Sequence, residues 1–312
     1  MKSLKVIQAI SYICNCRCDY CMNWGLAFNK REVPVEDLIK FYDKLFLAVD
    51  NDGNINFTIT GGEPFHNNVV SRTIELLKWL ISHPKIQQVR INTNGYFDIP
   101  DVCKNSKVLL QFSLDGKKEY CNGISHNPRL YDRLMKNVKY CNENSINYQF
   151  RTVVTETNIK DVPFVIKTAQ KNKHKVFIQT ARPVGGAKST ELIKNIDMTL
   201  ELKEKYEGQD YVEIVPIYTS CSMLNPDEKD CMTMLVNPFG EIGACAFLAT
   251  KYLSFLNIYN FLSFSPVSFK KRINIHIGDG TCCFPDGLDN FFNSLTKERA
   301  EEYKKKLGVN GI

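Results

Sequence analysis

Four cysteines fall within eight residues near the N-terminus, in the stretch CNCRCDYC (residues 14–21). Thiolates are soft ligands that suit iron–sulfur clusters and zinc better than hard cations. Cys14, Cys18 and Cys21 have the spacing C-x3-C-x2-C, which can hold three irons of a cuboidal [4Fe–4S] cluster and leave the fourth iron open. Structural zinc sites favour two paired knuckles, so zinc is the weaker interpretation. Cys16 is left over, and we expect it to be a bystander.

A second group of cysteines lies late in the chain, at positions 221, 231, 245, 282 and 283. The chain has twelve cysteines in all and begins without the apolar core and cleavage site of a secretory signal. A reducing cytosol does not keep structural disulfides. Such a large number of cysteines therefore favours metal or redox chemistry. Cys103, Cys121 and Cys141 are scattered between the two groups, and we expect them to be buried apolar side chains.

The elements that must position these residues alternate between two periodicities. Apolar runs typical of strands are followed by segments with apolar residues at helical spacing. Such alternation predicts a parallel sheet with right-handed crossovers, and six strands fall short of a closed eight-stranded barrel. We therefore predict an α/β fold with a partial (βα)6 TIM-like barrel. The predicted strands are 4–10, 54–60, 88–92, 107–114, 148–154 and 175–180, and the predicted helices are 35–49, 69–81, 129–141 and 162–172.

Glycine and polar residues follow the predicted strands at the same end. In barrels of this kind the chemistry lies at the carboxyl ends of the strands, because the loops converge there. The cysteine stretch follows the first strand, and the later strands are followed by further motifs. These motifs are GGEP (61–64), NTNG (92–95), SLDG (113–116), TETN (155–158) after the strand that carries Arg151, and ARPVGG (181–186).

This series of motifs resembles the radical S-adenosylmethionine (radical SAM) superfamily over residues 1 to about 195. The resemblance implies that Cys14, Cys18 and Cys21 hold a [4Fe–4S] cluster whose open iron binds SAM. It also implies a reductive cleavage of SAM to a 5′-deoxyadenosyl radical that abstracts a hydrogen atom from a substrate. The implied SAM-binding residues are Tyr20 at the adenine, Gly61, Gly62, Glu63 and Pro64 of GGEP, and Asn94, Ser113, Asp115 and Arg151 at the ribose or carboxylate.

Some of these roles have alternatives. A backbone carbonyl could take the place of Glu63 at the methionine ammonium. A guanidinium pairs with a carboxylate through two hydrogen bonds, and both Arg151 and Arg129 could do so. Asn94, Ser113 and Asp115 are also ordinary turn residues.

The C-terminal segment LVNPFGEIGACAF predicts a β-hairpin that turns at residues 237–240. It resembles the auxiliary-cluster domain called SPASM, or twitch when shortened. The resemblance implies one auxiliary [4Fe–4S] cluster, three domains (1–195, 196–220 as a bridging helix and strand, and 221–312) and a spare thiol. The implied ligands are Cys221, Cys231, Cys245 and Cys282. Cys283, or Cys282 in its place, is then either a buried thiol or a hydrogen-atom donor to a substrate radical, as in radical SAM epimerases.

The composition limits the partners. A net charge of +6 without a strong basic block does not favour nucleic acid, and the apolar segment 252–269 is too interrupted to cross a membrane. We expect a cytoplasmic enzyme that receives electrons from a flavodoxin or ferredoxin. The substrate is expected to be a ribosomally made peptide that is epimerised or crosslinked, and a sugar or cyclitol is the alternative. Only thirteen residues precede Cys14, so we expect that a separate protein could recognise the peptide. A non-catalytic iron–sulfur carrier is the alternative class, although it would not need GGEP.

Overall fold

The computed structural model describes residues 3–23, 31–181, 186, 192–216, 231–243, 257–259 and 296–307. They belong to two compact units. The barrel unit comprises residues 8–30 and 57–217, and the terminal unit comprises residues 1–7, 31–56 and 218–312. The first two strands run through both units, and each unit is described by itself below.

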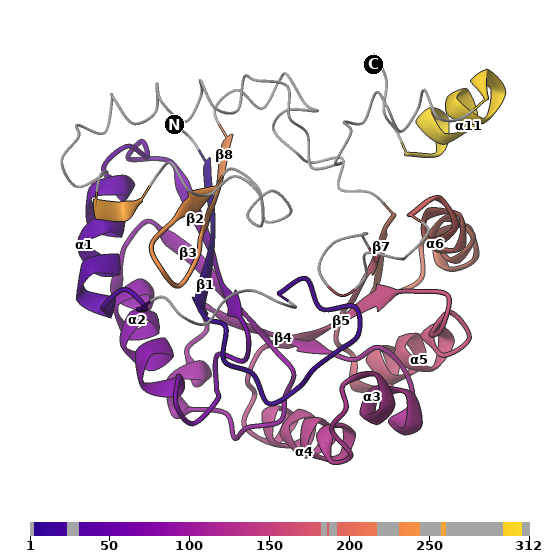
Figure 1. Ribbon diagram of the computed structural model, residues 1–312, viewed down its shortest axis with the longest axis horizontal. Helices are drawn as coiled ribbons and strands as arrows, with labels where there is room; N and C mark the ends of the chain where they lie inside the picture. Colours follow the sequence, from indigo (N-terminus) through magenta and orange to yellow (C-terminus); the bar gives the residue numbers. More distant parts are fainter. Residues whose placement is uncertain are drawn as a thin grey trace. The chain divides into compact units, whose positions relative to one another are not determined.

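The barrel unit contains an open sheet of strands in the order β7-β6-β5-β4-β3-β2-β1 (Figure 1). The strands from β3 to β7 pair in parallel. The six predicted strands are therefore confirmed, and the sheet does not close. The strands are β1 (Ser3–Ser11), β2 (Asn54–Gly61), β3 (Ile86–Thr93), β4 (Val108–Ser113), β5 (Tyr148–Val154), β6 (Val176–Thr180) and β7 (Val212–Val215).

Helices lie along one side of this sheet (Figure 1). Alternate strand residues, among them Ile91, Leu110, Phe112, Phe150 and Ile178, are fully buried. The alternation arises because successive side chains of a strand point to opposite faces. The helices of the barrel unit are α2 (Val70–Ser82), η1 (Asp101–Lys104), α3 (Lys118–Ile124), α4 (Leu130–Glu143), α5 (Val162–Asn172) and α6 (Leu192–Tyr206).

Two elements extend the sequence-based picture. The bridging strand is β7, which pairs with β6 through Val176↔Val212 and so joins the parallel sheet as a seventh strand. The short helix α3 was not predicted. It lies between SLDG and α4 and contains Gly123, a residue that disfavours helix.

The terminal unit contains the first half of β1, helix α1 (Val35–Phe46), the start of β2, and α11 (Lys297–Leu307). It also contains the predicted hairpin, formed by β8 (Cys231–Val236) and β9 (Ile242–Gly243). The two hairpin strands are antiparallel and pair Val236 with Ile242. Gly240 in the turn has a φ of 79°, which glycine adopts without strain. No helix in the described ranges is long and apolar enough to span a bilayer.

Candidate functional site

The GGEP loop continues from β2 and lies against the end of β1. The Gly62 N–H donates to the Ser11 carbonyl at 2.7 Å, and the Glu63 N–H donates to the Ile13 carbonyl at 2.8 Å. A Cβ atom on Gly61 would lie 2.1 Å from the Ser11 oxygen, and one on Gly62 would lie 2.2 Å from the Ile13 oxygen. Both glycines are therefore required for the close approach of GGEP to the chain that leads into the cysteines.

Glu63 is a buried carboxylate that joins two loops. One of its oxygens accepts from the Phe65 N–H at 3.0 Å and the Thr93 hydroxyl at 2.8 Å. The other oxygen accepts from the Asn94 N–H at 2.7 Å. The side chain is 1% exposed, and burial raises the pKa of Glu63 to about 7 against the lowering effect of these hydrogen bonds. Glu63 thus holds the GGEP loop against the end of β3.

Asn94 connects the end of β3 to the cysteine loop, which we define as residues 12–23. Its Nδ2 donates to Asn15 Oδ1 at 2.9 Å and lies 3.5 Å from Cys16 Sγ and 3.8 Å from Cys14 Sγ. The Oδ1 atom accepts from the Tyr96 N–H at 2.9 Å. The NTNG motif therefore contacts Cys14, one of the predicted cluster ligands, and Cys16 through a single side chain.

The four thiols of the cysteine loop differ in their electrostatics. A hydrogen bond from the Cys16 thiol lowers the pKa of Cys14, while the hydrogen bonds of Cys16 to Cys14 and Cys18 raise its own pKa. Burial raises the pKa of Cys21 to about 11. Within the described part of the chain, no three cysteine, histidine or acidic side chains already converge as a metal site. The ligand assignment therefore rests on thiolate chemistry and spacing.

Tyr20 and Asp115 are brought together by the fold. The Tyr20 hydroxyl donates to one oxygen of Asp115, and the Val153 N–H donates to the other at 2.8 Å. Burial raises the pKa of Asp115 to about 6, opposed by the Tyr20 and Val153 hydrogen bonds and by the charge of Arg151. SLDG is in this way tied to the cysteine loop and to β5.

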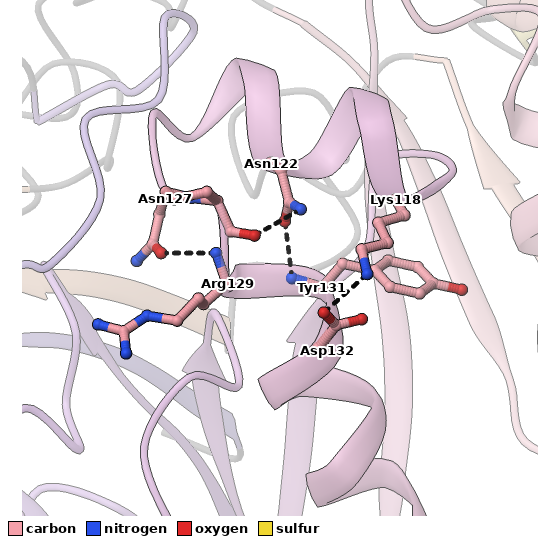
Figure 2. Close-up of polar contacts among 7 residues, drawn as sticks. Lys118, Asn122, Asn127, Arg129, Tyr131 and Asp132 are labelled. Atoms are coloured by element: carbon pink, nitrogen blue, oxygen red, sulfur yellow. Dashed lines mark hydrogen bonds and ion pairs between the residues drawn. The ribbon is translucent and has the colours of Figure 1, made fainter.

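Arg151 and Ser113 are register partners on β5 and β4, so their side chains lie on the same face of the sheet. The Nε atom of Arg151 is buried and has no hydrogen-bond partner among the described residues. A buried guanidinium nitrogen without a partner is costly and fits an anionic ligand. Arg129 differs, because it precedes α4 at an exposed position. Its backbone N–H donates to Asn127 Oδ1 at 3.2 Å (Figure 2).

The loop after β6 also reaches the cysteines. The Gly186 N–H donates to the Cys21 carbonyl at 2.9 Å. A Cβ atom on Gly186 would lie 2.1 Å from the Asp19 carbonyl oxygen. The last glycine of ARPVGG is therefore required at this position for close approach to the cysteine loop.

Sequence reasoning missed the turn between α3 and α4 as a support for the cysteine loop. The Ser125 and Ile124 carbonyls accept from the Arg17 and Asp19 N–H groups at 3.0 and 3.2 Å. The His126 ring lies 2.7 Å from an Asp19 oxygen. The only sequence signal for this turn is the polar run SHNP (125–128), which is typical of turns but does not indicate what the turn contacts.

The predicted auxiliary ligands cannot be placed. Cys221, Cys245, Cys282 and Cys283 lie outside the described residues, and of Cys231 only the backbone position in β8 is described.

Pro64 is buried, and its carbonyl accepts from the Thr73 hydroxyl at 2.7 Å. The remaining cysteines, Cys103, Cys121 and Cys141, are buried as expected.

A protein with closely spaced cysteine thiols after its first strand, glycine-mediated loop contacts and an open parallel sheet has the features of a radical SAM barrel. The family model of the radical SAM superfamily matches residues 9–169, which is just over half of the chain. The chain belongs to this superfamily.

Curated relatives match about three fifths of the chain. A GTP 3',8-cyclase of Clostridium perfringens (strain SM101 / Type A) is 25% identical over 201 residues, which cover 62% of this chain and 59% of the relative. A cysteine-type anaerobic sulfatase-maturating enzyme of Clostridium novyi (strain NT) is 27% identical over 197 residues, which cover 57% and 51%. The match thus spans about three fifths or less of the length of these relatives.

Solved structures share the fold. Streptococcus suis SuiB bound to S-adenosylmethionine is 17% identical with a TM-score of 0.64, over 82% of this chain and 63% of SuiB. Native anSMEcpe with bound AdoMet is 18% identical with a TM-score of 0.62, over 84% of this chain and 79% of that protein. These similarities support the partial-barrel fold.

Proposed function

We propose that this protein is a radical SAM enzyme that modifies a ribosomally made peptide. The observation that carries the proposal is the convergence of four loops on the cysteine loop through Gly62, Asn94, Asp115 and Gly186. When bound, the [4Fe–4S] cluster and SAM supply a 5′-deoxyadenosyl radical that removes a hydrogen atom from the substrate. The chain's own residues orient these groups and keep water away from the radical.

We assign the cluster ligands from their spacing and the SAM contacts from this geometry. Cys14, Cys18 and Cys21 would hold the cluster, because their C-x3-C-x2-C spacing suits three irons of a [4Fe–4S] cluster. The Tyr20 ring would contact the adenine while its hydroxyl is held by Asp115. Arg151 and Ser113, as register partners, would bind the SAM carboxylate. Arg151 is favoured over the exposed Arg129 because its buried Nε has no other partner among the described residues. Glu63 would act chiefly as a positioning residue, because both of its oxygens already accept hydrogen bonds.

A row of side-chain amides supports a peptide as the substrate. Asn92, Gln111 and Gln149 are register partners across β3, β4 and β5, on the same face as Arg151. The Asn92 Nδ2 donates to the Thr60 hydroxyl at 3.3 Å, and its buried Oδ1 has no partner in the described ranges. Amides offer both donors and acceptors, as peptide groups require. A nucleotide triphosphate would instead call for several cations.

The relatives support the same choice. One curated relative is a cysteine-type anaerobic sulfatase-maturating enzyme. The structure of SuiB has been solved with the precursor peptide SuiA bound, and that of anSMEcpe has been solved with a Cp18Cys peptide bound. The similarity to GTP 3',8-cyclases makes a small molecule the second candidate. An auxiliary [4Fe–4S] cluster on Cys221, Cys231, Cys245 and Cys282 remains part of the proposal, as does Cys283 as the hydrogen-atom donor of an epimerase.

Anaerobic reconstitution tests the proposal in two steps. Iron, sulfide and zinc analysis, followed by reduction with dithionite and SAM, should give a [4Fe–4S] protein that produces 5′-deoxyadenosine. Incubation with peptides encoded by genomic neighbours should then change a peptide. Loss of two mass units indicates crosslinking or oxidation, and deuterium uptake from solvent without another change indicates epimerisation. Zinc without iron, or iron without 5′-deoxyadenosine, would refute the radical SAM function. Turnover of GTP or a sugar instead of any peptide would refute the substrate class.

For an epimerase, Cys283→Ser should still cleave SAM and abstract hydrogen but form no epimer. Cys103→Ser, a change to a buried thiol in η1, is the control and should retain product formation if it folds. Normal epimerisation by Cys283→Ser would remove Cys283 from the mechanism.

A further inference from the structure

Positive side chains gather beside the cysteine loop. Arg129, Arg133 and Lys136 are spaced i, i+4 and i+7 at the start of α4, so they follow one side of that helix. Arg17 lies in the cysteine loop between Cys16 and Cys18. We call these four residues the basic face. Arg17, Arg129 and Lys136 are exposed, and Arg133 is half-buried with its Cζ 5.4 Å from the Tyr96 ring.

The basic face is held directly to the cluster-binding segment. The Arg17 N–H donates to the Ser125 carbonyl at 3.0 Å, and Ser125 lies in the turn that leads into α4. Asn127 in the same turn donates to the Asn15 carbonyl at 3.5 Å. Tyr96, which contacts Arg133, follows Asn94 and so connects to the loop through the Asn94–Asn15 hydrogen bond. The cations and the cysteines therefore belong to one connected set of loops.

The acidic groups nearby are already paired. Asp132 lies 2.8 Å from the Lys118 ammonium, and Figure 2 shows the Arg129 guanidinium extending away from that pair. Asp19 contacts the His126 ring, and Asp98 lies 3.5 Å from the Lys136 ammonium. Arg17 and Arg129 form no ion pair with any described residue. Of the four cations only Lys136 is ion-paired within the described residues, and the Asp19 carboxylate offsets one further charge, so the basic face keeps a positive excess.

From this arrangement we infer that the basic face is the docking surface for an acidic one-electron carrier protein of the flavodoxin class. The inference rests on the proposed function, in which each SAM cleavage consumes one electron that must come from outside the chain. The carrier would lose one electron and the cluster would gain it. Redox encounters use small interfaces, and complementary charge raises their association rate about 10- to 1000-fold at low ionic strength. The basic face offers a small surface next to the cysteine loop and a charge complementary to that of an acidic carrier.

A double charge reversal tests the inference. Arg133→Glu/Lys136→Glu changes the basic face on α4 and leaves Arg17 of the cysteine loop and Arg129, the alternative SAM residue, in place. Lys167→Glu/Lys171→Glu on α5 is the matched control, because both lysines are exposed and the net charge changes equally. Two readouts are taken for each protein. The first is the affinity for an oxidised, fluorescently labelled acidic flavodoxin at low and high salt. The second is the rate of 5′-deoxyadenosine formation with reduced flavodoxin and, separately, with dithionite.

We expect the Arg133/Lys136 variant to lose about tenfold or more in flavodoxin affinity and in flavodoxin-driven rate at low salt, with the gap closing as salt screens the charges. Its iron content and dithionite-driven rate should match the wild type and the control. An equal loss with both reductants would overturn the inference, because the residues would then serve the cluster or SAM. No loss, or an equal loss in the control, would also overturn it. Absence of 5′-deoxyadenosine from the dithionite-reduced wild type would instead refute the proposed function.

Discussion

Tyr20 and Asp115 are 95 residues apart in the chain, and the fold joins them by a hydrogen bond from the phenol to the carboxylate. The same carboxylate accepts from the Val153 N–H, so one buried group connects the cysteine loop, the end of β4 and β5. Its pKa of about 6 places its ionisation close to neutral pH. The contact makes the protonation state of Asp115 dependent on Tyr20, a residue between two of the proposed cluster ligands.

Replacing Tyr20 by Phe should therefore raise the pKa of Asp115. The Tyr20 hydroxyl is the largest influence that lowers the pKa of Asp115, so its removal should raise that pKa above about 6. If Asp115 binds SAM as a carboxylate, the fall in SAM affinity on acidification should begin at a higher pH in the variant. Equilibrium dialysis of SAM between pH 5 and 8 (roughly the range around that pKa) measures the shift.

Tyr140→Phe is the control, because the Tyr140 ring lies beside Lys104 and does not act on the pKa of Asp115, so its loss should leave the profile unchanged. A Tyr20→Phe profile that coincides with the wild type, or moves to lower pH, would mean that Asp115 does not control SAM binding.

Gly62→Ala should disrupt the cysteine loop. The new Cβ would lie 2.2 Å from the Ile13 oxygen, and backbone rather than a flexible side chain must move to relieve the overlap. We expect a loss of about 1–3 kcal/mol in stability and a lower iron content after reconstitution. Thermal unfolding and iron analysis measure the two effects.

Gly123→Ala provides a matched comparison within α3. A Cβ atom there meets no atom within 4 Å, and alanine favours a helix over glycine by about 0.5–1 kcal/mol. The Gly123 variant should be as stable as the wild type or more stable, with full iron content. Equal behaviour of the two glycine variants would contradict the role assigned to Gly62.

Arg151 should matter more than Arg129 for SAM. Arg151→Lys removes the planar fork that pairs with a carboxylate but keeps the charge. We expect SAM affinity to fall about tenfold or more, equivalent to about 1.4 kcal/mol. Arg129→Lys should change the affinity less than twofold, because Arg129 is exposed. Isothermal titration of SAM into both variants measures the difference, and the reverse order would assign the carboxylate to Arg129.

The strands and the main helices could be predicted because their signals are local. The alternation in NINFTIT and YQFRTVV marks β2 and β5, and the turn residues at their ends mark the loops. The short helix α3 escaped prediction because its seven residues include Gly123 and are too few to show a helical period. The strand β7 joins the sheet because it pairs with β6. No local sequence pattern specifies this pairing.

The site could be predicted only as far as residue types and strand ends allow. The motifs indicated which residues would gather, but not which would touch. Both oxygens of Glu63 accept hydrogen bonds, from Phe65, Thr93 and Asn94. These contacts depend on the distance between two loops, which the sequence does not indicate. The support of Asp19 by Ile124 and His126 likewise depends on how α3 packs beside the cysteines.

Cys16→Ala should retain the cluster, whereas Cys14→Ala should lose it. Cys14 accepts hydrogen bonds, including one from the Cys16 N–H at 3.4 Å that the alanine variant keeps. Cys16 lies outside the C-x3-C-x2-C spacing, so we expect that it is not required as a ligand. Iron analysis and electron paramagnetic resonance of the reduced proteins measure the outcome. Loss of iron from both variants would make Cys16 a ligand or an essential support.

The effect of Glu63→Gln on the free energy of unfolding should depend on pH, because Glu63 is a buried carboxyl that ionises. The pKa of Glu63 is raised by burial from 4.5 to about 7 in the folded protein, so the folded state binds the proton more tightly. Its contribution to stability is then complete below about pH 4.5 and is lost as the pH rises to about 7, at up to about 1.4 kcal/mol per pH unit. Glutamine does not ionise, and it presents an amide to three hydrogen-bond donors, which costs about 1–3 kcal/mol at any pH.

The stability advantage of the wild type over Glu63→Gln should therefore shrink as the pH rises from about 4.5 to about 7. Urea unfolding at several pH values, with Glu119→Gln as an exposed control on α3, measures this difference. A gap that stays constant or widens with pH would show that the three donors outweigh burial and keep Glu63 ionised throughout. In that case Glu63 would hold the GGEP and NTNG loops together as a permanent anion, and its pKa would lie below rather than above the usual value.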